Sequence, residues 1–484
     1  MANFKALAKD TAIYGLSSIV GRFLNYLLTP LYTYKIAAAS GGYGVITNIY
    51  AYVALLLVIL TFGMETTFFS FANREDKDPR MVFSTALRMV GTVALAFVAA
   101  VFVFIGPISS ALGYADHPSY VWTMALVVAI DAFQCILFAY LRYQKKSLRF
   151  ASLKLLNIGM SIALNLWVFL VMARTREVGV GYVFYINLFC SAFLTFFLLK
   201  ELKGITYGFS RGMMKEMLSY SWPLLIFGIA GILNQTADKM LFPYIYKGED
   251  ASVQLGIYGA SVKIAMIMAM ITQAFRYAYE PFVFGSAREK DSRESYALGM
   301  KYFIIFTLLA YLCVMAYMDV LKYVVSPGYW DGLKVVPVVM AAEIMMGIYF
   351  NLSFWYKLTG KTIWGAVFSG IGCLALLLVN FIFVPKYGFM ACAWGGFAGY
   401  GLAMLTSYFV GQKYYPIAYP LRDIFSYMIL AGILFAGISY VNGHLSMVPA
   451  LLSNTMILAV FAAYVVRKDF PLSGLPLVGK YFRN

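Results

Sequence analysis

The stretch "YGLSSIVGRFLNYLLTP", Tyr14–Pro30, is apolar over a length that suits a membrane-spanning helix. Two polar residues, Arg22 and Asn25, nevertheless lie inside it, and Pro30 lies near its outer end. Arg22 falls about ten residues into the predicted helix Thr11–Ile36, which places it roughly 15 Å along the helix axis. A guanidinium at that depth needs a cavity or an opposite charge beside it, because lipid offers neither water nor a counter-ion.

This stretch has a counterpart about 212 residues further along the chain, "FGIAGILNQTADKMLFP" over Phe227–Pro243. The two align without a gap and share a glycine and the proline, whereas Gln235 stands at the position of Arg22. Six predicted helices separate the copies, so both have the same orientation, related by an axis along the membrane normal. Weaker matches agree with this offset: Ser84–Met89 with Ser295–Met300, Glu65–Ala72 with Glu280–Ala287, and Asp131 with Glu343.

The composition places most of the chain in lipid. Of its 484 residues, 62% are hydrophobic and 12% are charged, against about 45–50% and about 25% in a soluble protein. The apolar runs are too long and too uniform for barrel strands. We therefore predict an all-α polytopic membrane protein with about fourteen spans: Thr11–Ile36, Tyr43–Phe71, Phe83–Ile105, Ser119–Leu141, Ala151–Met172, Gly179–Leu199, Leu218–Tyr246, Val253–Val283, Met300–Val325, Val335–Tyr356, Thr362–Val384, Phe389–Val410, Ile424–Val441 and Met447–Val466.

The repeat and the helices together predict two six-helix lobes related by a pseudo-twofold axis. The lobes cover residues 1–205 and 206–415, and a further helix pair with a tail covers residues 416–484. The first ten residues lack the short apolar core and small-residue cleavage site of a secretory signal, so we expect the first span to be retained.

The net charge of +16 is distributed unevenly. With a cytoplasmic N-terminus, about 26 Lys and Arg fall in cytoplasmic segments and about seven in external loops. This bias predicts that both termini are cytoplasmic, and it explains the basic charge without a nucleic-acid partner. The five cysteines lie in apolar runs and the two histidines in predicted external loops, so we expect no disulfide framework and no metal site.

No motif for nucleotide hydrolysis or nucleophilic catalysis is present, and no loop is longer than about 20 residues. An enzyme acting on polysaccharide is expected to carry a large loop or domain outside the membrane. The sequence therefore predicts a protein that is not an enzyme and that works between its helices without a cofactor. Active transport would then draw on a H⁺ or Na⁺ gradient or on coupled metabolism.

Few ionisable residues lie within the predicted spans, and these are the candidate site residues. We expect cations to line a substrate cavity and carboxylates to couple ions or form charge pairs. A third group near the cytoplasmic ends, together with Arg276, is expected to form a gate. The cations are Arg22, Lys239, Lys263 and Arg276; the carboxylates are Asp131, Asp238 and Glu343; and the gate residues are Glu65, Arg88 and Glu280.

Each assignment has a structural alternative. Arg22 and the carboxylates would serve equally in buried ion pairs, and the gate residues would serve in interfacial snorkelling. Asp238 and Lys239 are adjacent, so on a helix they point about 100° apart and are not expected to face one partner. Lys263 is the cation expected to lie near Asp238, or near an anionic ligand.

Three stretches of the sequence carry a family resemblance: "TAIYGLSSIVGRFLNYLLTPLYT" (Thr11–Thr33), "GMETTFFSFANRED" (Gly63–Asp76) and "YLRYQKKSLRFASLKLLNIGMSIALNL" (Tyr140–Leu166). They resemble the polysaccharide transporter family, which contains the Wzx-type O-antigen flippases and belongs to the multidrug/oligosaccharidyl-lipid/polysaccharide (MOP) superfamily. The likeness extends over essentially the whole chain.

The resemblance implies a flippase of the bacterial cytoplasmic (inner) membrane that moves an undecaprenyl-diphosphate-linked oligosaccharide by alternating access, for lipopolysaccharide, O-antigen or other surface polysaccharide. It also implies contacts with membrane lipids and with a polymerase and chain-length machinery. The cationic cavity of the family would then correspond to the cations named above.

Two related activities remain open as alternatives. The lipid II flippase resembles this chain in layout but usually begins with a basic S-R-x-x-G-x-x-R-like pattern, where this chain has "SSIVGRFLN" (Ser17–Asn25). A drug exporter of the MATE type normally has twelve helices, and the additional C-terminal pair argues against it.

Overall fold

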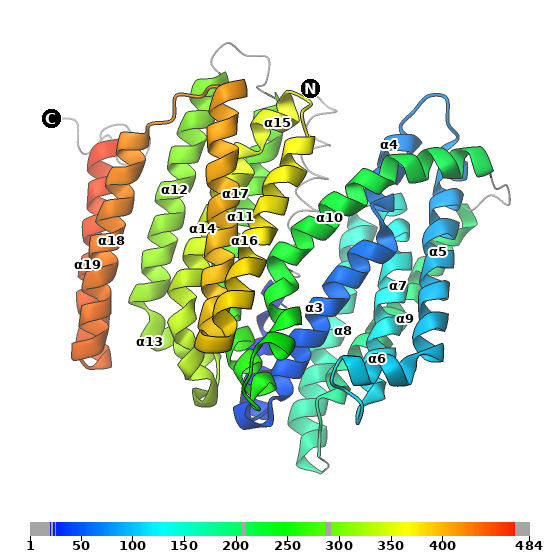
Figure 1. Ribbon diagram of the computed structural model, residues 1–484, viewed down its shortest axis with the longest axis horizontal. Coiled ribbons are helices and arrows are strands. Elements are labelled where there is room, and N and C mark those ends of the chain that lie inside the picture. The colour runs from blue at the N-terminus through cyan, green and yellow to red at the C-terminus, as the bar shows by residue number, and fades with distance from the viewer. Residues whose placement is uncertain are drawn as a thin grey trace. The chain divides into compact units, whose positions relative to one another are not determined.

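The computed structural model describes residues 20, 23–24, 26–175, 177–204, 210–285 and 292–469. Every regular element among these residues is a helix (Figure 1). Thirteen of their helical segments are long and apolar enough to cross a membrane, which confirms an all-α polytopic membrane protein. The first part of the predicted span Thr11–Ile36 lies outside the described residues, and its last part is the short helix α2 (Leu28–Lys35).

The long helices follow the predicted order, with ends that differ by several residues. The α-helices after α2 are α3 (Gly42–Thr61), α4 (Met64–Ala72), α5 (Pro79–Val103), α6 (Ile105–Ala111), α7 (Pro118–Tyr143), α8 (Ser147–Leu166), α9 (Gly181–Leu198), α10 (Arg211–Ile245), α11 (Ala251–Gly285), α12 (Ser292–Ala316), α13 (Met318–Leu321), α14 (Val336–Leu352), α15 (Phe354–Leu358), α16 (Ile363–Tyr387), α17 (Phe389–Tyr414), α18 (Leu421–His444) and α19 (Met447–Asp469). Shorter helical turns are Ala38–Ser40, Trp167–Val171, Met172–Arg174, Leu199–Gly204, Lys322–Val324 and Pro327–Val335.

The chain divides into two compact units, each described separately below. The first contains residues 1–260 and 373–395, and the second contains residues 261–372 and 396–484. Within the first unit α10 packs against α3, although the repeat assigns α10 to the second lobe. The lobe boundaries at residues 205 and 415 stay a prediction, because units defined by packing need not coincide with repeated sequence.

The predicted span Tyr43–Phe71 is not one helix. Phe62 and Gly63 adopt positive φ angles of 32° and 73°, and they separate α3 from α4. A Cβ on Gly63 would lie 2.9 Å from the Leu224 Cβ, so this backbone conformation and this packing both favour glycine. The apolar run is continuous across the break, which is why hydropathy did not reveal it.

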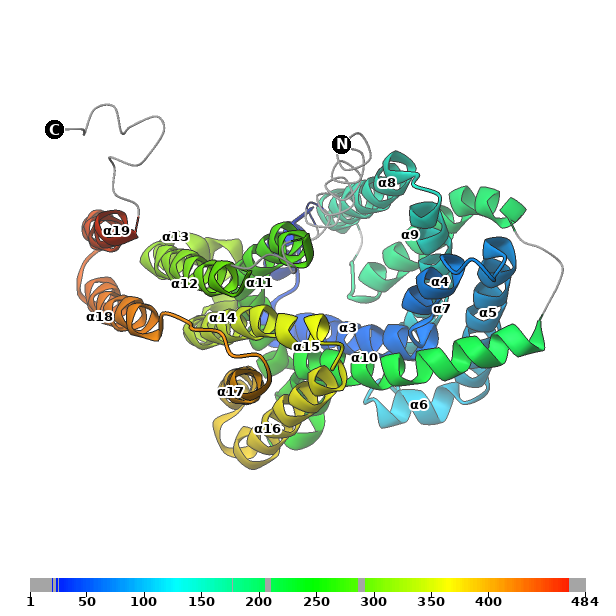
Figure 2. The same cartoon turned by 90° about the horizontal axis from the view of Figure 1, so that it is seen from above.

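The core of the first unit lies among α4, α5, α7 and α9, and Figure 2 shows α4, α5 and α7 grouped together. The rings of Phe83 and Tyr140 stack with centroids 4.0 Å apart, and Phe68 packs edge-on against both. On the outside of α5, Leu95 and Val103 are each 73% exposed. Large apolar side chains directed outward are expected where a helix faces lipid tails instead of water.

The backbones of α3 and α11 approach closely in the first unit. A Cβ on Gly44 would lie 1.8 Å from the carbonyl oxygen of Ser252, and a Cβ on Gly256 would lie 2.9 Å from the Gly44 amide nitrogen. Small residues permit this kind of contact between membrane helices, where van der Waals packing drives association. The two glycines therefore hold α3 and α11 together.

We expect Gly44→Ala to prevent this contact, because the obstacle is backbone and cannot move aside as a side chain can. The yield of monodisperse protein in detergent should fall several-fold, and the thermal transition should shift downward. Gly159→Ala is the matched control, since within the described part of the chain nothing outside its own stretch of α8 lies within 4 Å of a Cβ at that position. Equal behaviour of the two variants would contradict the close packing of α3 on α11.

In the second unit the C-terminal pair, α18 and α19, packs against α12 (Figures 1 and 2). The fully buried Asn454 donates from its Nδ2 to the carbonyl oxygen of Ala316 at 2.9 Å and to the Asn442 Oδ1 at 2.7 Å. The Asn442 Nδ2 donates in turn to the Met315 carbonyl oxygen at 3.3 Å. These bonds satisfy carbonyls at the C-terminus of α12, where helical partners are missing, and they tie the pair to it.

A cluster of four charges joins the same three helices at their other ends. Lys301 of α12 is 6% exposed and pairs with Asp423 of α18, at 3.1 Å, and with Asp469 of α19. Asp423 also pairs with Lys468 at 2.8 Å. The Tyr427 hydroxyl donates to Asp469. None of these residues stands out in the sequence, because each lies near an end of a predicted or observed helix.

Candidate functional site

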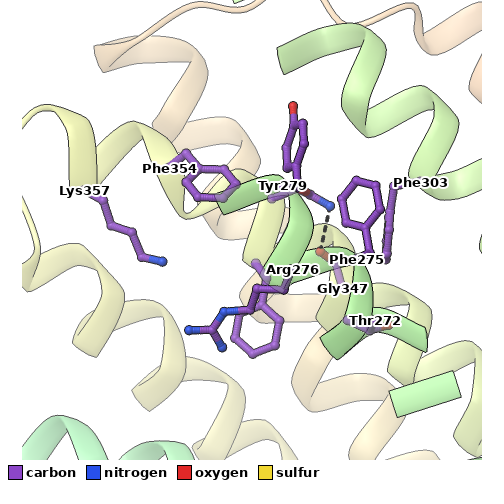
Figure 3. Close-up of a pocket in the computed structure, with 10 residues that line it drawn as sticks. Thr272, Phe275, Arg276, Tyr279, Phe303, Gly347, Phe354 and Lys357 are labelled. Atoms are coloured by element: carbon purple, nitrogen blue, oxygen red, sulfur yellow. Dashed lines mark hydrogen bonds between the residues drawn. The ribbon is translucent and has the colours of Figure 1, made fainter. Parts of the chain in front are cut away.

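The second unit contains a cavity with two basic side chains in its wall (Figure 3). Arg276 comes from α11 and Lys357 from α15, and both side chains extend toward the same open space. About 280 Å³ of space lies between the lining atoms, and part of it is open solvent. The lining residues are Thr272, Phe275, Arg276, Tyr279, Phe303, Gly347, Phe350, Asn351, Phe354 and Lys357.

Close helix packing shapes this cavity. A Cβ on Gly347 of α14 would lie 2.2 Å from the Phe303 Cζ, so only glycine lets the ring of Phe303 approach α14. The Asn351 Nδ2, one turn later, donates to the Gly347 carbonyl oxygen at 3.2 Å. Because a carbonyl only accepts, the amide nitrogen faces the helix and the Asn351 Oδ1 is left for another donor.

Aromatic faces hold the two cations in place. The Arg276 guanidinium lies 4.8 Å from the centroid of the Phe350 ring, and the Lys357 Nζ lies 5.2 Å from that of Phe354. Such cation–π contacts are favourable and help to fix the positions of the two cations. None of the ten lining residues that the structure describes is acidic, so the combined charge of these ten is positive. The cavity is therefore suited to an anionic group such as a phosphate.

The sequence analysis predicted Arg276 as a cavity cation but missed Lys357. Lys357 stands one position beyond the predicted span Val335–Tyr356, among the many basic residues at helix ends that the positive-inside rule explains. Only the approach of α15 to α11 distinguishes it from the others. The role of Arg276 in binding substrate stays a prediction.

Lys239 and Asp238 of α10 pair with each other in the first unit. The Lys239 Nζ lies 2.9 Å from the Asp238 Oδ2 and donates to the Gln235 carbonyl oxygen at 3.0 Å. Asp238 is 5% exposed and accepts a further hydrogen bond from the Tyr258 hydroxyl at 2.7 Å. The sequence did not indicate that these two neighbours pair with each other, which the flexible lysine stem permits by folding back by one helical turn.

Lys263, expected near Asp238, lies half-buried in the part of α11 that belongs to the second unit. Asp238 already has a cation and a hydroxyl beside it. Its negative charge is thus balanced within the first unit. Lys239 likewise pairs with a carboxylate, and an anionic substrate would have to compete with that carboxylate for the lysine.

Asp131 of α7 lies among polar groups of neighbouring helices in the first unit. Its Oδ1 accepts a hydrogen bond from the Ser191 hydroxyl of α9 at 2.8 Å. The charge of Lys154 on α8 lies near enough to interact with it. Gln134, about one helical turn further along α7, donates to the Ser191 carbonyl oxygen at 2.7 Å. The predicted alternatives for Asp131, ion coupling and charge pairing, both fit these surroundings.

Glu65 of α4 forms an ion pair with Arg142 at the end of α7. Its other carboxylate oxygen accepts from the Cys135 thiol at 3.0 Å. From the sequence, Glu65 was predicted as a gate residue, and nothing indicated a pair with Arg142. Glu65 and Arg142 are far apart in the sequence, and they meet because α4 packs against α7.

The remaining predicted residues are less informative. Arg88 of α5 and Glu343 of α14 are half-buried, and the gate that would include Arg88 stays a prediction. Arg22 lies outside the described residues, as does the side chain of Glu280. Among the described residues no group of three or more His, Cys, Asp or Glu side chains is arranged to hold a metal ion.

Several solved structures have the same fold. A lipid II flippase, MurJ, in an inward closed conformation matches with a TM-score of 0.72 and 14% identity over 93% of this chain and 98% of that one. An inward-facing multidrug resistance MATE transporter of the MOP superfamily matches with a TM-score of 0.66 and 13% identity over 81% and 94%. A crystal structure of MATE in the straight conformation matches with a TM-score of 0.57 and 15% identity over 84% and 95%. The chain thus has the fold of the MOP superfamily.

A sequence model for polysaccharide biosynthesis proteins matches residues 40–326, more than half of the 484-residue chain. This chain belongs to that polysaccharide biosynthesis protein family. No curated protein sequence matches it significantly. The family and the transporter fold agree with the predicted resemblance and with the prediction that the chain is not an enzyme.

Proposed function

We propose that this protein moves an undecaprenyl-diphosphate-linked oligosaccharide across the bacterial cytoplasmic membrane for surface polysaccharide synthesis. Membership of the polysaccharide biosynthesis family supports the pathway, and the fold of MATE transporters and MurJ supports transport through the membrane. The observation that carries the proposal is the cationic cavity around Arg276 and Lys357. Movement follows alternating access, in which the polyprenyl tail stays in lipid while the headgroup passes through the protein.

The chemistry of the cavity fits the diphosphate. Arginine offers paired N–H donors that match two oxygens of a phosphate, and lysine adds a second positive charge. In the predicted topology, Arg276 and Lys357 lie near the cytoplasmic ends of their spans. A lipid-linked oligosaccharide assembled on the cytoplasmic side would meet this cavity first. The polymerase and chain-length proteins would then act on it at the outer face.

The direct test is a deletion strain assayed for surface polysaccharide and for lipid-linked intermediates. We expect surface polysaccharide to disappear and the intermediate to accumulate on the cytoplasmic face, with both effects reversed by the intact gene. Normal export combined with altered drug sensitivity would contradict the proposal and favour a drug exporter of the MATE type.

A lipid II flippase is the second candidate, because the MurJ structure matches over nearly the full length of both chains. The two candidates share a polyprenyl diphosphate and differ in the attached sugars. Proteoliposomes containing lipid II and, separately, an undecaprenyl-diphosphate oligosaccharide would distinguish them. Transport of lipid II alone would favour the second candidate.

We further propose that Asp131 couples transport to a H⁺ or Na⁺ gradient, because it is a carboxylate inside the membrane region that accepts a hydrogen bond from Ser191 and lies within range of the charge of Lys154. Asp131→Asn keeps the shape of the side chain and can still accept from Ser191, but it cannot exchange a proton or offer a full charge to Na⁺. We expect gradient-driven transport in proteoliposomes to fall at least about tenfold, while binding of undecaprenyl diphosphate is kept. Unchanged gradient dependence would contradict the assignment, and Glu343→Gln tests the position related by the repeat.

A further inference from the structure

A group of basic side chains lies in the first unit where α7 turns into α8 and where α9 ends. We call it the basic cluster, and it comes from residues 145–149 and 199–204. Glu201, which is 4% exposed, joins the two segments, because its Oε1 lies 2.9 Å from the Arg149 Nη2 and its Oε2 lies 3.8 Å from the Lys146 Nζ. The Arg149 Nη2 also donates to the Phe197 carbonyl oxygen of α9 at 3.3 Å. These contacts hold the two segments against each other.

The basic cluster carries more positive charge than its own carboxylate balances. It contains one acidic residue, Glu201, and five basic residues: Lys145, Lys146, Arg149, Lys200 and Lys203. Within the described part of the chain no carboxylate pairs with Lys145, Lys200 or Lys203, and all three are exposed. In the predicted topology the cluster lies on the cytoplasmic side of the membrane. The positive-inside rule explains each basic residue there, but it does not require a buried carboxylate that gathers them.

Lys145 stands at a position where the backbone favours glycine. Its φ angle of 56° lies in the left-handed region. The Lys145 amide donates to the Arg142 carbonyl oxygen and the Lys146 amide donates to the Leu141 carbonyl oxygen, both at 3.0 Å. These two bonds form the Schellman arrangement that ends α7, in which glycine usually takes the left-handed position. A lysine there strains the backbone, and binding of an anion by its side chain would offset that strain.

Exposed apolar strips extend from the basic cluster along two helices that pack together, α8 and α9 (Figure 2). Leu148 and Leu155, two turns apart on α8, are exposed. On α9 the exposed rings of Phe189, Phe193 and Phe197 follow one another at one-turn spacing, with centroids 5.9 Å and 5.1 Å apart. Each strip matches an acyl chain, and the charged end of the strips matches a phosphate.

From this arrangement we propose that the basic cluster and the two strips bind an anionic two-chain phospholipid of the cytoplasmic leaflet, such as phosphatidylglycerol. The phosphate lies at Lys145 and Lys146, and one acyl chain lies along each strip. A zwitterionic lipid adds a cation that the lysines repel, so the site selects a net negative headgroup. Undecaprenyl diphosphate has one chain, whereas the two strips accommodate two. The inference does not depend on the proposed function.

The test measures lipid binding to the purified full-length protein by native mass spectrometry. The probes are phosphatidylglycerol and phosphatidylcholine with the same acyl chains, and undecaprenyl diphosphate. We expect wild-type protein to bind phosphatidylglycerol about tenfold more tightly than phosphatidylcholine, by about 1.4 kcal/mol. Lys145→Gly combined with Lys146→Gln should abolish this preference and leave binding of phosphatidylcholine unchanged. Because glycine adopts the φ angle of position 145 without strain, this variant should keep the wild-type thermal transition.

Two control variants accompany this one. Lys145→Arg combined with Lys146→Arg keeps both charges and should keep the preference for phosphatidylglycerol. Lys413→Gln combined with Arg422→Gln removes the same two charges from exposed positions outside the basic cluster, and it should also keep the preference. Phosphatidylglycerol with a photoreactive acyl chain should label peptides that contain residues 189–197.

Three outcomes would overturn the inference. If wild-type protein binds the two phospholipids equally, the site does not select an anionic lipid. If the variants at positions 145–146 and at 413 and 422 lose the preference equally, the net charge of the protein attracts the lipid. If the variant with Lys145→Gly weakens undecaprenyl diphosphate alone, the cluster belongs to the substrate. Failure of wild-type protein to bind undecaprenyl diphosphate would instead count against the proposed function and leave this inference standing.

Discussion

Replacing Arg276 and Lys357 together by alanine is expected to weaken binding of undecaprenyl diphosphate by about 100-fold. Hydrogen bonds to charged groups contribute about 1.5–3 kcal/mol each, so losing one from each side chain costs about 3 kcal/mol or more. A loss of about 1.4 kcal/mol is a tenfold change. Binding to purified protein in nanodiscs measures the effect, and transport in proteoliposomes should fall in parallel.

Arg276→Lys refines this experiment. The variant keeps the positive charge but loses the planar pair of donors, so we expect an intermediate loss of about tenfold. A variant with Lys413→Ala and Arg422→Ala is the matched control, because it removes the same two charges from exposed positions outside the cavity. If the control weakens binding as much as the cavity variant, the net basic charge of the protein is responsible and the cavity is not the site.

Lys301→Met is expected to destabilise the attachment of α18 and α19 to α12 by about 3 kcal/mol. The substitution leaves the Asp469 carboxylate, which is 10% exposed, without its cation, and breaking one partner from a buried ion pair costs about 3–5 kcal/mol. The lower end of this energy range applies, because Asp423 is 34% exposed and still pairs with Lys468 after the substitution. Thermal unfolding in detergent, or limited proteolysis before Leu421, measures the change.

Lys468→Met is the control for this prediction. The side chains of Lys468 and Asp423 are 31% and 34% exposed. Removing this ion pair should therefore cost no more than about 1 kcal/mol. Adding Asp469→Asn to Lys301→Met removes the uncompensated charge and should restore part of the stability. If Lys301→Met unfolds at the wild-type temperature, the cluster does not hold the helix pair.

The candidate site was only partly accessible from the sequence. Arg276 was found because an arginine inside an apolar run is costly without a partner or a cavity. Lys357, Asn351 and Gly347 carry no such signal, since lysine at a helix end and glycine or asparagine in a membrane helix are ordinary. The pairing of Glu65 with Arg142 was missed because it joins helices whose packing hydropathy does not reveal.

The sequence by itself determined that the chain is an all-helical membrane protein, and it placed the spans in order, because some 20 apolar residues must form a helix in lipid. It also indicated the family, through similarity along the whole chain. The tertiary structure alone decided which charges meet: Lys239 with Asp238, Glu65 with Arg142, and Arg276 with Lys357 in one cavity wall. The physical reason is that a hydropathy pattern reports burial in lipid or protein, whereas charge partners depend on helix rotation and packing, which small residues such as Gly44 and Gly347 set.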